Sequence, residues 1–374
     1  MKVLYLTEWY PHRYDAMSGL FVRKHAAAAV RAGADVCVLY LLKDTSIRRI
    51  ERISQITDGI HEIYIYYPSS YLSALREGWR MVREQWGKPD VCQLNVITKN
   101  ALLPLRLKRR YHIPYIIIEH WTGYLDRNPD YRNGSCLHRW LAERTAREAE
   151  TILCVSSELM HAMQACGLRN NHWHVLNNVV DDFFYDLPLP HKPNKHFQLL
   201  HISCFDEPHK NVKGLLRAVK KVAAERTDFR LTIAGTGVDF EDVRRYADTL
   251  SLPDDLLRWT GELPPEQIAE AFATADAFVL FSNYETAGVV LAESLASGTP
   301  ILSTPVGIAP EVVNDKTGIL VPIGDEDALA QTIIRMINRS TPYDAPTIRT
   351  YGRDFSYQQV GAQLMHWYEQ ARRS

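Results

Sequence analysis

The 374-residue chain lacks the features that mark membrane, secreted and nucleic-acid-binding proteins. No apolar run approaches the roughly 18 residues of a membrane-spanning helix. The N-terminus runs straight into an apolar, strand-like segment, so we expect no signal peptide. The formal net charge of −1 argues against general nucleic-acid binding, which needs a strongly basic face. We therefore expect a cytoplasmic protein with no nucleic acid among its partners.

The six cysteines are too scattered to build a disulfide framework or a metal site. They form no Cys-x-x-Cys pair and no Cys/His cluster at ligand spacing, so we expect reduced thiols. A convincing Asp-x-Asp motif is also missing: Asp181 and Asp182 are adjacent in a loop, and residues 325–327 read as a helix start. We expect no metal and no bound cofactor.

The chain does contain a recurring alternation of short apolar runs and helix-like segments. Since single cores stop growing beyond roughly 250–300 residues, two domains are expected, and the proline-rich residues 188–195 are typical of a linker. The alternation predicts two doubly wound parallel sheets, with ligand bound between the carboxyl ends of their strands. The predicted strands are residues 2–7, 35–40, 90–94, 114–119, 151–155, 197–203, 230–234, 277–281 and 300–303, and the predicted helices are residues 21–31, 99–111, 139–149, 211–225, 239–250, 265–273, 287–297, 325–338 and 355–372.

Two glutamates eight positions apart are the most informative feature. Glu285 directly follows an apolar strand, and Glu293 lies inside a helix that is expected to begin at about Ala287. At 1.5 Å per residue, the two acids sit on the order of 10 Å apart along the helix. Between them, Gly288 exposes backbone N–H groups at the helix start, where an anion is favoured. Two carboxylates flanking an anion cradle suit a nucleotide sugar, which carries hydroxyls at both ends and phosphate between.

This segment resembles the Glu-x7-Glu motif of glycosyltransferase family 4, which comprises retaining transferases of GT-B architecture. The resemblance continues through residues 296–322 and covers nearly the whole chain. It implies an α/β fold of two Rossmann-like domains with a cleft between them. The first domain would comprise residues 1–188 plus 355–374, whose final helix crosses back onto it, and the second, nucleotide-sugar-binding domain would comprise residues 195–350.

The same resemblance implies roles for the residues of the motif. Glu285 would hold hydroxyls of the donor sugar, and Glu293 would hold the nucleotide ribose. The backbone amides of Gly288, Val289 and Val290 would face the diphosphate. Without the flanking matches, the two acids could equally be solvated glutamates beside a core helix.

A basic loop at residues 203–214 is similar to the family's phosphate clamp, with one departure. Lys210 is the better match to the family lysine, and Lys213 is the competing match. Cys204 stands where the family has an arginine, so one positive charge is missing and either lysine could replace it. A lysine at a helix start is otherwise usually just solvated.

Two residues of the first half resemble the family's sugar-facing elements. Gly19 resembles its glycine loop, where the absent side chain lets the backbone approach phosphate and sugar. His120 follows a buried strand and resembles the strand-end histidine that faces the reacting sugar, with Glu119 and Trp121 as support. A plain turn glycine and a structural histidine are the alternatives.

Together, the residues and the resemblance imply a metal-independent, retaining hexosyltransferase with His120, Lys210 and Glu285 as its catalytic set. The donor would be a UDP- or GDP-linked sugar, and the acceptor a glycan or lipid-linked hydroxyl in surface polysaccharide or glycolipid assembly. A nucleotide-sugar epimerase of the same architecture is one alternative. A non-catalytic nucleotide-sugar-binding module is another, motivated by Cys204.

Two basic amphipathic segments, residues 71–86 and 102–111, leave a peripheral membrane contact open. Their arginines flank apolar stripes, and each cation near an anionic lipid surface contributes about 1 kcal/mol. Such contact would hold the protein at the inner face of the membrane. The alternative is a core-facing stripe with a solvated basic flank.

Overall fold

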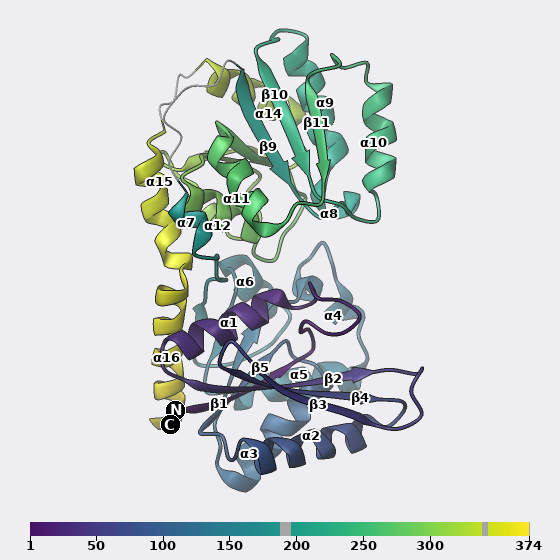
Figure 1. The fold of residues 1–374 in the computed structure, drawn as a ribbon, viewed down its shortest axis with the longest axis vertical. Coiled ribbons are helices and arrows are strands. Elements are labelled where there is room, and N and C mark those ends of the chain that lie inside the picture. The colour runs from purple at the N-terminus through teal and green to yellow at the C-terminus, as the bar shows by residue number, and fades with distance from the viewer. Residues whose placement is uncertain (188–195, 339–342, 374) are drawn as a thin grey trace. The chain divides into compact units, whose positions relative to one another are not determined.

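The computed structural model describes residues 1–187, 196–338 and 343–373, which divide into two compact α/β units (Figure 1). Unit 1 comprises Met1–Val179 and Tyr357–Ser374, and unit 2 comprises Val180–Ser356. Each unit is built on one sheet with helices packed against it, which confirms the predicted class of two Rossmann-like domains. The predicted linker at 188–195 lies outside the described residues.

The sheet of unit 1 has the strand order β3-β4-β2-β1-β5-β6-β7-β8 within the described residues. Neighbouring strands pair in parallel, apart from the antiparallel pair β3–β4. The central strands are buried apolar runs, as expected for a parallel sheet covered on both faces. The strands are β1 (Lys2–Thr7), β2 (Asp35–Lys43), β3 (Glu51–Thr57), β4 (Ile60–Tyr67), β5 (Val91–Asn95), β6 (Tyr115–Glu119), β7 (Ile152–Cys154) and β8 (Trp173–Val175).

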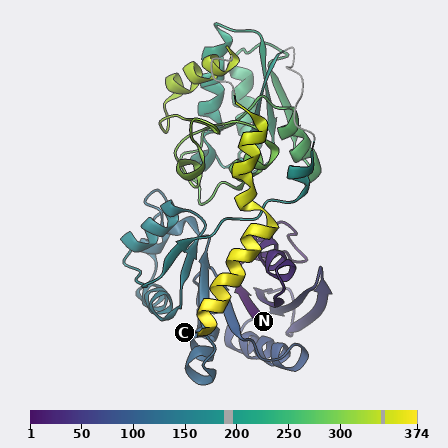
Figure 2. The same ribbon diagram turned by 90° about the vertical axis from the view of Figure 1, so that its left-hand side faces the viewer.

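Helices cover both faces of this sheet, with α1 on one side and α2 and α3 on the other (Figure 1). The last helix, α16, packs along α1 (Figure 2). Their close approach requires Gly361, because a Cβ atom there would lie 2.5 Å from the carbonyl oxygen of Ala28. The helices are α1 (Leu20–Arg31), α2 (Tyr71–Gln85), η1 (Lys99–Ala101), α3 (Leu102–Tyr111), η2 (Thr122–Tyr124), α4 (Asp130–Asn133), α5 (Cys136–Glu148), α6 (Ser157–Ala165) and α16 (Tyr357–Arg373).

The sheet of unit 2 has the order β11-β10-β9-β12-β13-β14 within the described residues, and its neighbouring strands pair in parallel. Its core forms where the apolar stripe of α9, including Leu215, Leu216 and Val219, packs onto buried strand residues. The strands are β9 (Phe197–Ile202), β10 (Phe229–Ala234), β11 (Leu257–Gly261), β12 (Ala277–Leu280), β13 (Ile301–Ser303) and β14 (Gly318–Leu320). The helices are α7 (Phe183–Asp186), α8 (Glu207–Lys210), α9 (Val212–Ala223), α10 (Phe240–Thr249), α11 (Pro265–Thr274), α12 (Val289–Ser297), α13 (Ala309–Val312), α14 (Glu326–Ile337), α15 (Ala345–Gly352) and η3 (Arg353–Phe355).

Several element boundaries differ from those predicted, each for a local reason. The helix predicted from residue 139 begins at Cys136, because the Ser135 hydroxyl accepts a hydrogen bond from the His138 N–H at 3.2 Å and caps it. The helix predicted from about Ala287 begins at Val289, because Gly288 adopts a left-handed conformation before it. The β3–β4 hairpin was not predicted. Asp325 caps α14 as predicted, accepting from the Ala328 N–H at 2.9 Å.

Candidate functional site

The structure brings together two predicted site residues of unit 2 that are far apart in the sequence. The Lys210 ammonium nitrogen lies 2.5 Å from Oε1 of Glu285, and both side chains are largely buried. Lys210 is the last residue of α8, and Glu285 lies in the loop between β12 and α12. The two side chains therefore form a partly desolvated ion pair at the carboxyl edge of the sheet, where open α/β sheets bind ligands.

Hydrogen bonds between loops hold this ion pair in place. The Ser282 hydroxyl donates to Glu285 Oε1 at 2.8 Å, and the Thr304 hydroxyl donates to the carbonyl of Ser282 at 2.6 Å. The backbone N–H of Asn283 donates to the carbonyl of His209 at 2.7 Å, which ties the loop of Glu285 to α8. The position of Glu285 is thus fixed from both of its neighbouring loops.

The start of α12 lies next to the carboxylate of Glu285. Gly288 has a φ of 72°, and a Cβ atom at Gly288 would be 3.6 Å from Cγ of Glu285. Gly307 packs against the same loop, since a Cβ atom added at Gly307 would lie 2.6 Å from the carbonyl oxygen of Ala287. Val289 and Val290 begin the helix and are half-buried. The first N–H groups of a helix lie outside its own hydrogen-bond ladder, so this end can receive an anion.

The other predicted donor-binding residues of unit 2 lie in varied surroundings. Glu293 is half-buried on α12. The ammonium of Lys213 pairs with Asp242 of α10, and its backbone N–H donates to Glu207 Oε1 at 2.8 Å. Cys204 is exposed. Of the two candidate lysines, the structure therefore joins Lys210 to Glu285 and joins Lys213 to a different helix.

In unit 1, Gly19 packs directly onto the backbone that follows β1. Its φ is 59°, and a Cβ atom at this position would lie 2.3 Å from the carbonyl carbon and oxygen of Trp9. Gly19 also caps α1, accepting from the N–H of Val22 at 2.9 Å. No other residue type fits this position without moving the backbone.

His120 is buried close to the first turn of α1. Its ring centroid lies 4.4 Å from that of Phe21 and 5.6 Å from that of His25. Its Nε2 atom has no hydrogen-bond partner among the described residues. Burial, and then the neighbouring His25, hold the pKa of His120 well below its usual value. The imidazole is therefore neutral at pH 7, and its Nε2 atom is both buried and unpaired within the described residues.

Glu119 fixes the backbone turn that carries His120. One carboxylate oxygen accepts from the N–H groups of His120 and Trp121, and the other accepts from that of Ile97, all at 3.0 Å. Burial raises the pKa of Glu119 to about 7, although these three donors oppose the shift. Glu119 thus supports the turn of His120 through the backbone, as expected from the sequence.

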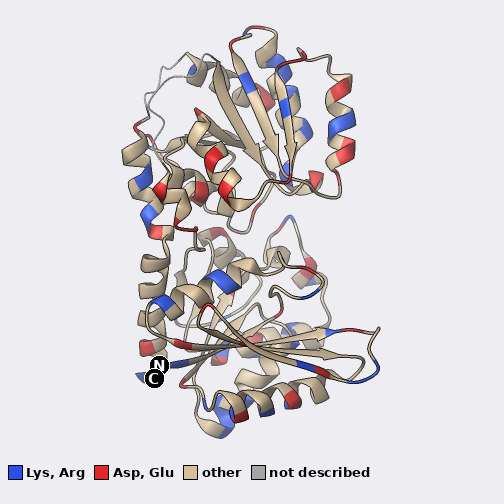
Figure 3. Ribbon diagram, in the orientation of Figure 1, with Lys and Arg blue, Asp and Glu red and all other residues tan. Residues whose placement is uncertain are grey.

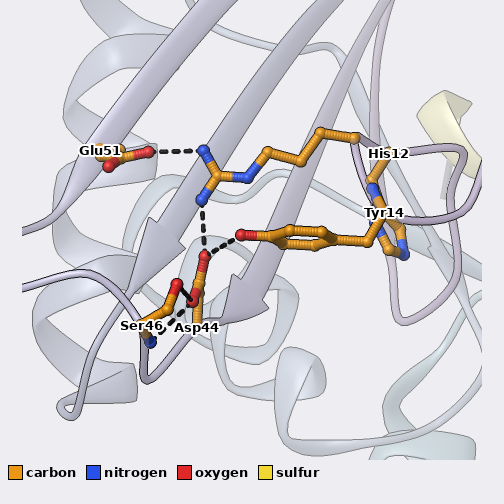
Figure 4. A network of polar contacts seen from close by, with 6 residues as sticks. His12, Tyr14, Asp44, Ser46 and Glu51 are labelled. Carbon is orange, nitrogen blue, oxygen red and sulfur yellow. Dashed lines mark hydrogen bonds and ion pairs between the residues drawn. The ribbon is translucent and has the colours of Figure 1, made fainter.

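A second polar network anchors the loop between β1 and α1 that leads to Gly19 (Figure 4). The Arg13 guanidinium donates to Asp44 and to Glu51, each at 2.6 Å, and the Tyr14 hydroxyl donates to Asp44 at 2.5 Å. The Ser46 hydroxyl and then that of Tyr14 hold the pKa of Asp44 well below its usual range. The loop is thereby tied to the β2–β3 connection.

Sequence reasoning missed three residues of these surroundings: His25, Glu207 and Ser282. Ser282 stands at the end of an apolar strand, which was a usable signal. The Glu207 carboxylate accepts a hydrogen bond at 2.9 Å from the N–H of Val212, five residues later. This spacing matches no standard capping motif. His25 lies on a helix whose contact with His120 depends on tertiary packing. Among residues 1–187, 196–338 and 343–373, no three His, Cys, Asp or Glu side chains gather as a metal site.

Two family models match the chain, one in each half. Residues 18–178 match the glycosyl transferase 4-like domain, and residues 190–353 match the glycosyl transferases of group 1. The first match contains Gly19 and His120, and the second contains Lys210, Glu285 and Glu293.

Curated relatives match parts of the chain. Phosphatidyl-myo-inositol mannosyltransferase from Mycolicibacterium smegmatis is 29% identical over 57% of this chain and 55% of its own. N-acetyl-alpha-D-glucosaminyl L-malate synthase from Bacillus anthracis is 33% identical over 37% of this chain and 35% of its own. The match thus spans about half, or less, of the length of these relatives.

Solved structures share the fold over nearly the whole chain. Sucrose-phosphate synthase from Thermosynechococcus elongatus has a TM-score of 0.72 at 18% identity and covers 99% of both chains. HepE from Anabaena, in complex with UDP and glucose, has a TM-score of 0.73 at 16% identity, also covering 99% of both. Together with the two family models, these likenesses support placing the chain among the GT-B glycosyltransferases of group 1.

Proposed function

We propose that this chain is a glycosyltransferase that moves a hexose-type sugar from a nucleotide-sugar donor to an acceptor hydroxyl, with retention of configuration and without a metal. The observation that carries the proposal is the Lys210–Glu285 ion pair beside the start of α12. It joins a cation, a hydroxyl-binding carboxylate and helix-start amides, which are the groups that a sugar diphosphate requires. The comparisons do not favour an epimerase or a non-catalytic module.

In this proposal, unit 2 binds the donor. The N–H groups at residues 288–290 and the ammonium of Lys210 take the negative charge that develops on the departing diphosphate. Glu285 accepts hydrogen bonds from the sugar hydroxyls, Glu293 binds the ribose, and Lys213 is the second candidate cation. Donors that are preorganised around developing charge lower such barriers most.

Unit 1 is proposed to act on the transferred sugar through Gly19 and His120. Because His120 is neutral, its role is that of a hydrogen-bond partner rather than a charged acid. The acceptor hydroxyl attacks the anomeric carbon from the face that the nucleotide leaves, forming the new C–O bond as the sugar–phosphate bond breaks. Its proton passes to an oxygen of the departing phosphate.

The names of the relatives support a glycan or lipid-linked acceptor and a UDP- or GDP-linked donor. They include an alpha-monoglucosyldiacylglycerol synthase from Streptococcus pneumoniae and a GDP-mannose-dependent mannosyltransferase from Corynebacterium glutamicum. A solved structure of the same fold is in complex with UDP-glucose. We propose a place in glycolipid or surface polysaccharide assembly at the cytoplasmic side of the membrane. Within the described residues, no helix combines the length and apolar character of a membrane span.

Thermal unfolding with UDP, GDP and ADP tests the donor site. A nucleotide at 100 times its Kd should stabilise the protein by about 2.7 kcal/mol. We expect one of the first two to raise the Tm, and the matching nucleotide sugars are then assayed for nucleotide release with glycan and lipid-linked acceptors. No shift with any nucleotide would contradict the proposal.

Replacing Glu285 by Gln tests the residue that carries the proposal. We expect kcat/KM for transfer to fall by roughly 100-fold or more, because the variant loses the charged acceptor for the sugar hydroxyls. Glu266→Gln makes the same chemical change on the exposed first turn of α11 and serves as the control. Since Glu285→Gln leaves the buried ammonium of Lys210 unpaired, its Tm is measured alongside. Full transfer activity in a folded Glu285→Gln variant would sink the assignment.

A further inference from the structure

Unit 1 carries a groove that lies outside the proposed transfer site. It encloses a cavity of ≈ 870 Å³ lined by α2, α3 and α5. Figure 1 shows α2 and α3 on the face of the sheet opposite to α1, the helix that Gly19 caps. We call this feature the α2–α3–α5 groove. It is large enough for a small-molecule or lipid ligand.

Exposed apolar side chains line the groove. Leu72, Leu102 and Trp140 are 54%, 40% and 53% exposed, and Leu137 beside them is 73% exposed. Each lies in the first two turns of its helix, so that all three helices contribute exposed apolar groups. Large apolar groups gathered on a surface in this way mark a binding face rather than a solvated one.

The same lining is strongly basic. No acidic residue lines the groove within the part of the chain that the structure describes, and α3 contains none at all. Four of the five arginines that line the groove form no ion pair with any residue that the structure describes. Figure 3 shows Lys and Arg along α2 and α3 in blue. The five lining arginines are Arg76, Arg106, Arg109, Arg110 and Arg144, of which Arg144 alone has an ion-pair partner in the described chain, Glu148 at 2.9 Å.

The arginine and apolar groups alternate within one surface. The Arg144 guanidinium lies 5.4 Å from the centroid of the Trp140 ring, which joins a cation to an aromatic face. Trp rings favour the boundary between water and an apolar phase, and arginine stems reach along apolar surface while their charges stay hydrated. A ligand that matches both features has an apolar chain next to an anionic group.

We infer that the α2–α3–α5 groove binds an anionic phospholipid at a membrane surface. The acyl chain contacts Leu72, Leu102 and Trp140, and the arginines hold the phosphate. Arginine suits this task better than lysine, because its planar guanidinium donates two parallel hydrogen bonds to one phosphate. The inference does not depend on the proposed transfer reaction.

Co-sedimentation of the full chain with lipid vesicles tests the groove. We expect binding to vesicles of phosphatidylcholine mixed with phosphatidylglycerol and little binding to phosphatidylcholine alone. Because each cation near an anionic surface contributes roughly fivefold in affinity, the double variant Arg106→Gln/Arg109→Gln should bind about 30-fold more weakly. Arg48→Gln/Arg49→Gln removes the same charge from an exposed loop of the same unit and should bind nearly as the unmodified chain does.

A Trp140→Ser variant separates apolar contact from simple charge attraction. It should lose the part of vesicle binding that persists at high salt, because screening weakens only the electrostatic part. Equal losses in the groove and loop double variants would overturn the inference, as would equal binding to both vesicle types. If the chain bound soluble polyglutamate as tightly as anionic vesicles, the inferred ligand would be an acidic protein and not a lipid. The assay contains no sugar donor, so it can fail while the transfer proposal stands.

Discussion

The two units share an α/β framework but hold their candidate site residues in opposite electrostatic states. In unit 2, Lys210 and Glu285 form an ion pair with side chains 18% and 10% exposed. In unit 1, His120 and His25 are buried as neutral rings, since burial lowers the pKa of both. The difference fits the proposal that unit 2 binds a charged ligand and that unit 1 contacts uncharged groups such as hydroxyls.

Burial, with no anionic partner for either ring, keeps the histidines of unit 1 neutral. The Nε2 atom of His25 donates to the carbonyl of Asn177 at 3.0 Å, which leaves Nδ1 as the unprotonated nitrogen. Glu119 is the nearest carboxylate along the chain to His120, yet its oxygens are taken up by backbone N–H groups. Neither ring therefore gains the anionic partner that would favour its protonated form.

The largest expected effect distinguishes the two lysines of unit 2. Lys210→Met should lower kcat/KM for transfer by roughly 100- to 1,000-fold, because it removes the cation beside Glu285 and the start of α12. Lys213→Met should lower it by less than about fivefold, since an exposed ion pair such as that with Asp242 contributes little. Steady-state kinetics with the nucleotide sugar identified by thermal shift provides the measurement. The opposite ranking would make Lys213 the phosphate clamp and break the proposed link to Glu285.

The fold class and the presence of a helix after Glu285 could be predicted because both depend on local sequence. Alternating apolar segments determine the parallel sheets, and a glycine before an apolar run indicates where α12 begins. The β3–β4 hairpin was missed although Asp58 and Gly59 gave a signal, since both have positive φ in a two-residue turn. Its outer strand is polar and exposed, so apolar patterning did not reveal it.

The pairings inside the candidate sites could not be predicted, because they depend on contacts between distant segments. Lys210 is the better match to the family pattern and Lys213 the competing one, and only folding shows that Lys210 meets Glu285 while Lys213 meets Asp242. The contact between His25 and His120 likewise arises from packing α1 beside the end of β6.

The buried Glu119 and His25 make the stability of unit 1 depend on pH. The pKa of Glu119 is about 7 in the folded protein against an ordinary value of 4.5, so the folded state retains a proton that the unfolded state has lost. The contribution of Glu119 to the unfolding free energy should therefore fall as pH rises from 4.5 to about 7. His25 acts in the opposite direction: its pKa falls from 6.5 to about 4, so its contribution grows as pH rises between these values.

Glu119→Gln removes the contribution of Glu119 to the pH dependence of the unfolding free energy and leaves that of His25. Between pH 4.5 and 6.5, its stability should rise more steeply with pH than that of the unmodified chain, with a difference of up to about 3 kcal/mol. Urea unfolding followed by tryptophan fluorescence provides the measurement, because seven of the eight tryptophans lie in unit 1 and only Trp259 lies in unit 2. Parallel pH profiles would show that Glu119 is ionised in the folded state, and the contrast between the units would weaken.

The smallest effect compares the two glycines on which the site helices begin. Gly19 of unit 1 and Gly288 of unit 2 both cap a helix with positive φ, so an alanine at either costs about 1–2 kcal/mol in backbone strain. At Gly288 the nearest neighbour of the new Cβ would be Cδ1 of Leu291 at 3.2 Å, a flexible side-chain end. At Gly19 it would be the backbone of Trp9 at 2.3 Å, which cannot move cheaply. Gly19→Ala should therefore cost about 1–3 kcal/mol more than Gly288→Ala.

Gly33→Ala calibrates the strain alone, because Gly33 has a φ of 94° and nothing lies within 4 Å of its Cβ position. In denaturant unfolding of the three variants, Gly33→Ala and Gly288→Ala should lose similar amounts of unfolding free energy, and Gly19→Ala should lose more. Equal losses would mean that the loop after β1 yields easily, so that steric exclusion does not define the Gly19 site. The predicted ranking would instead show that unit 1 shapes its site by backbone packing, whereas unit 2 relies on paired charges.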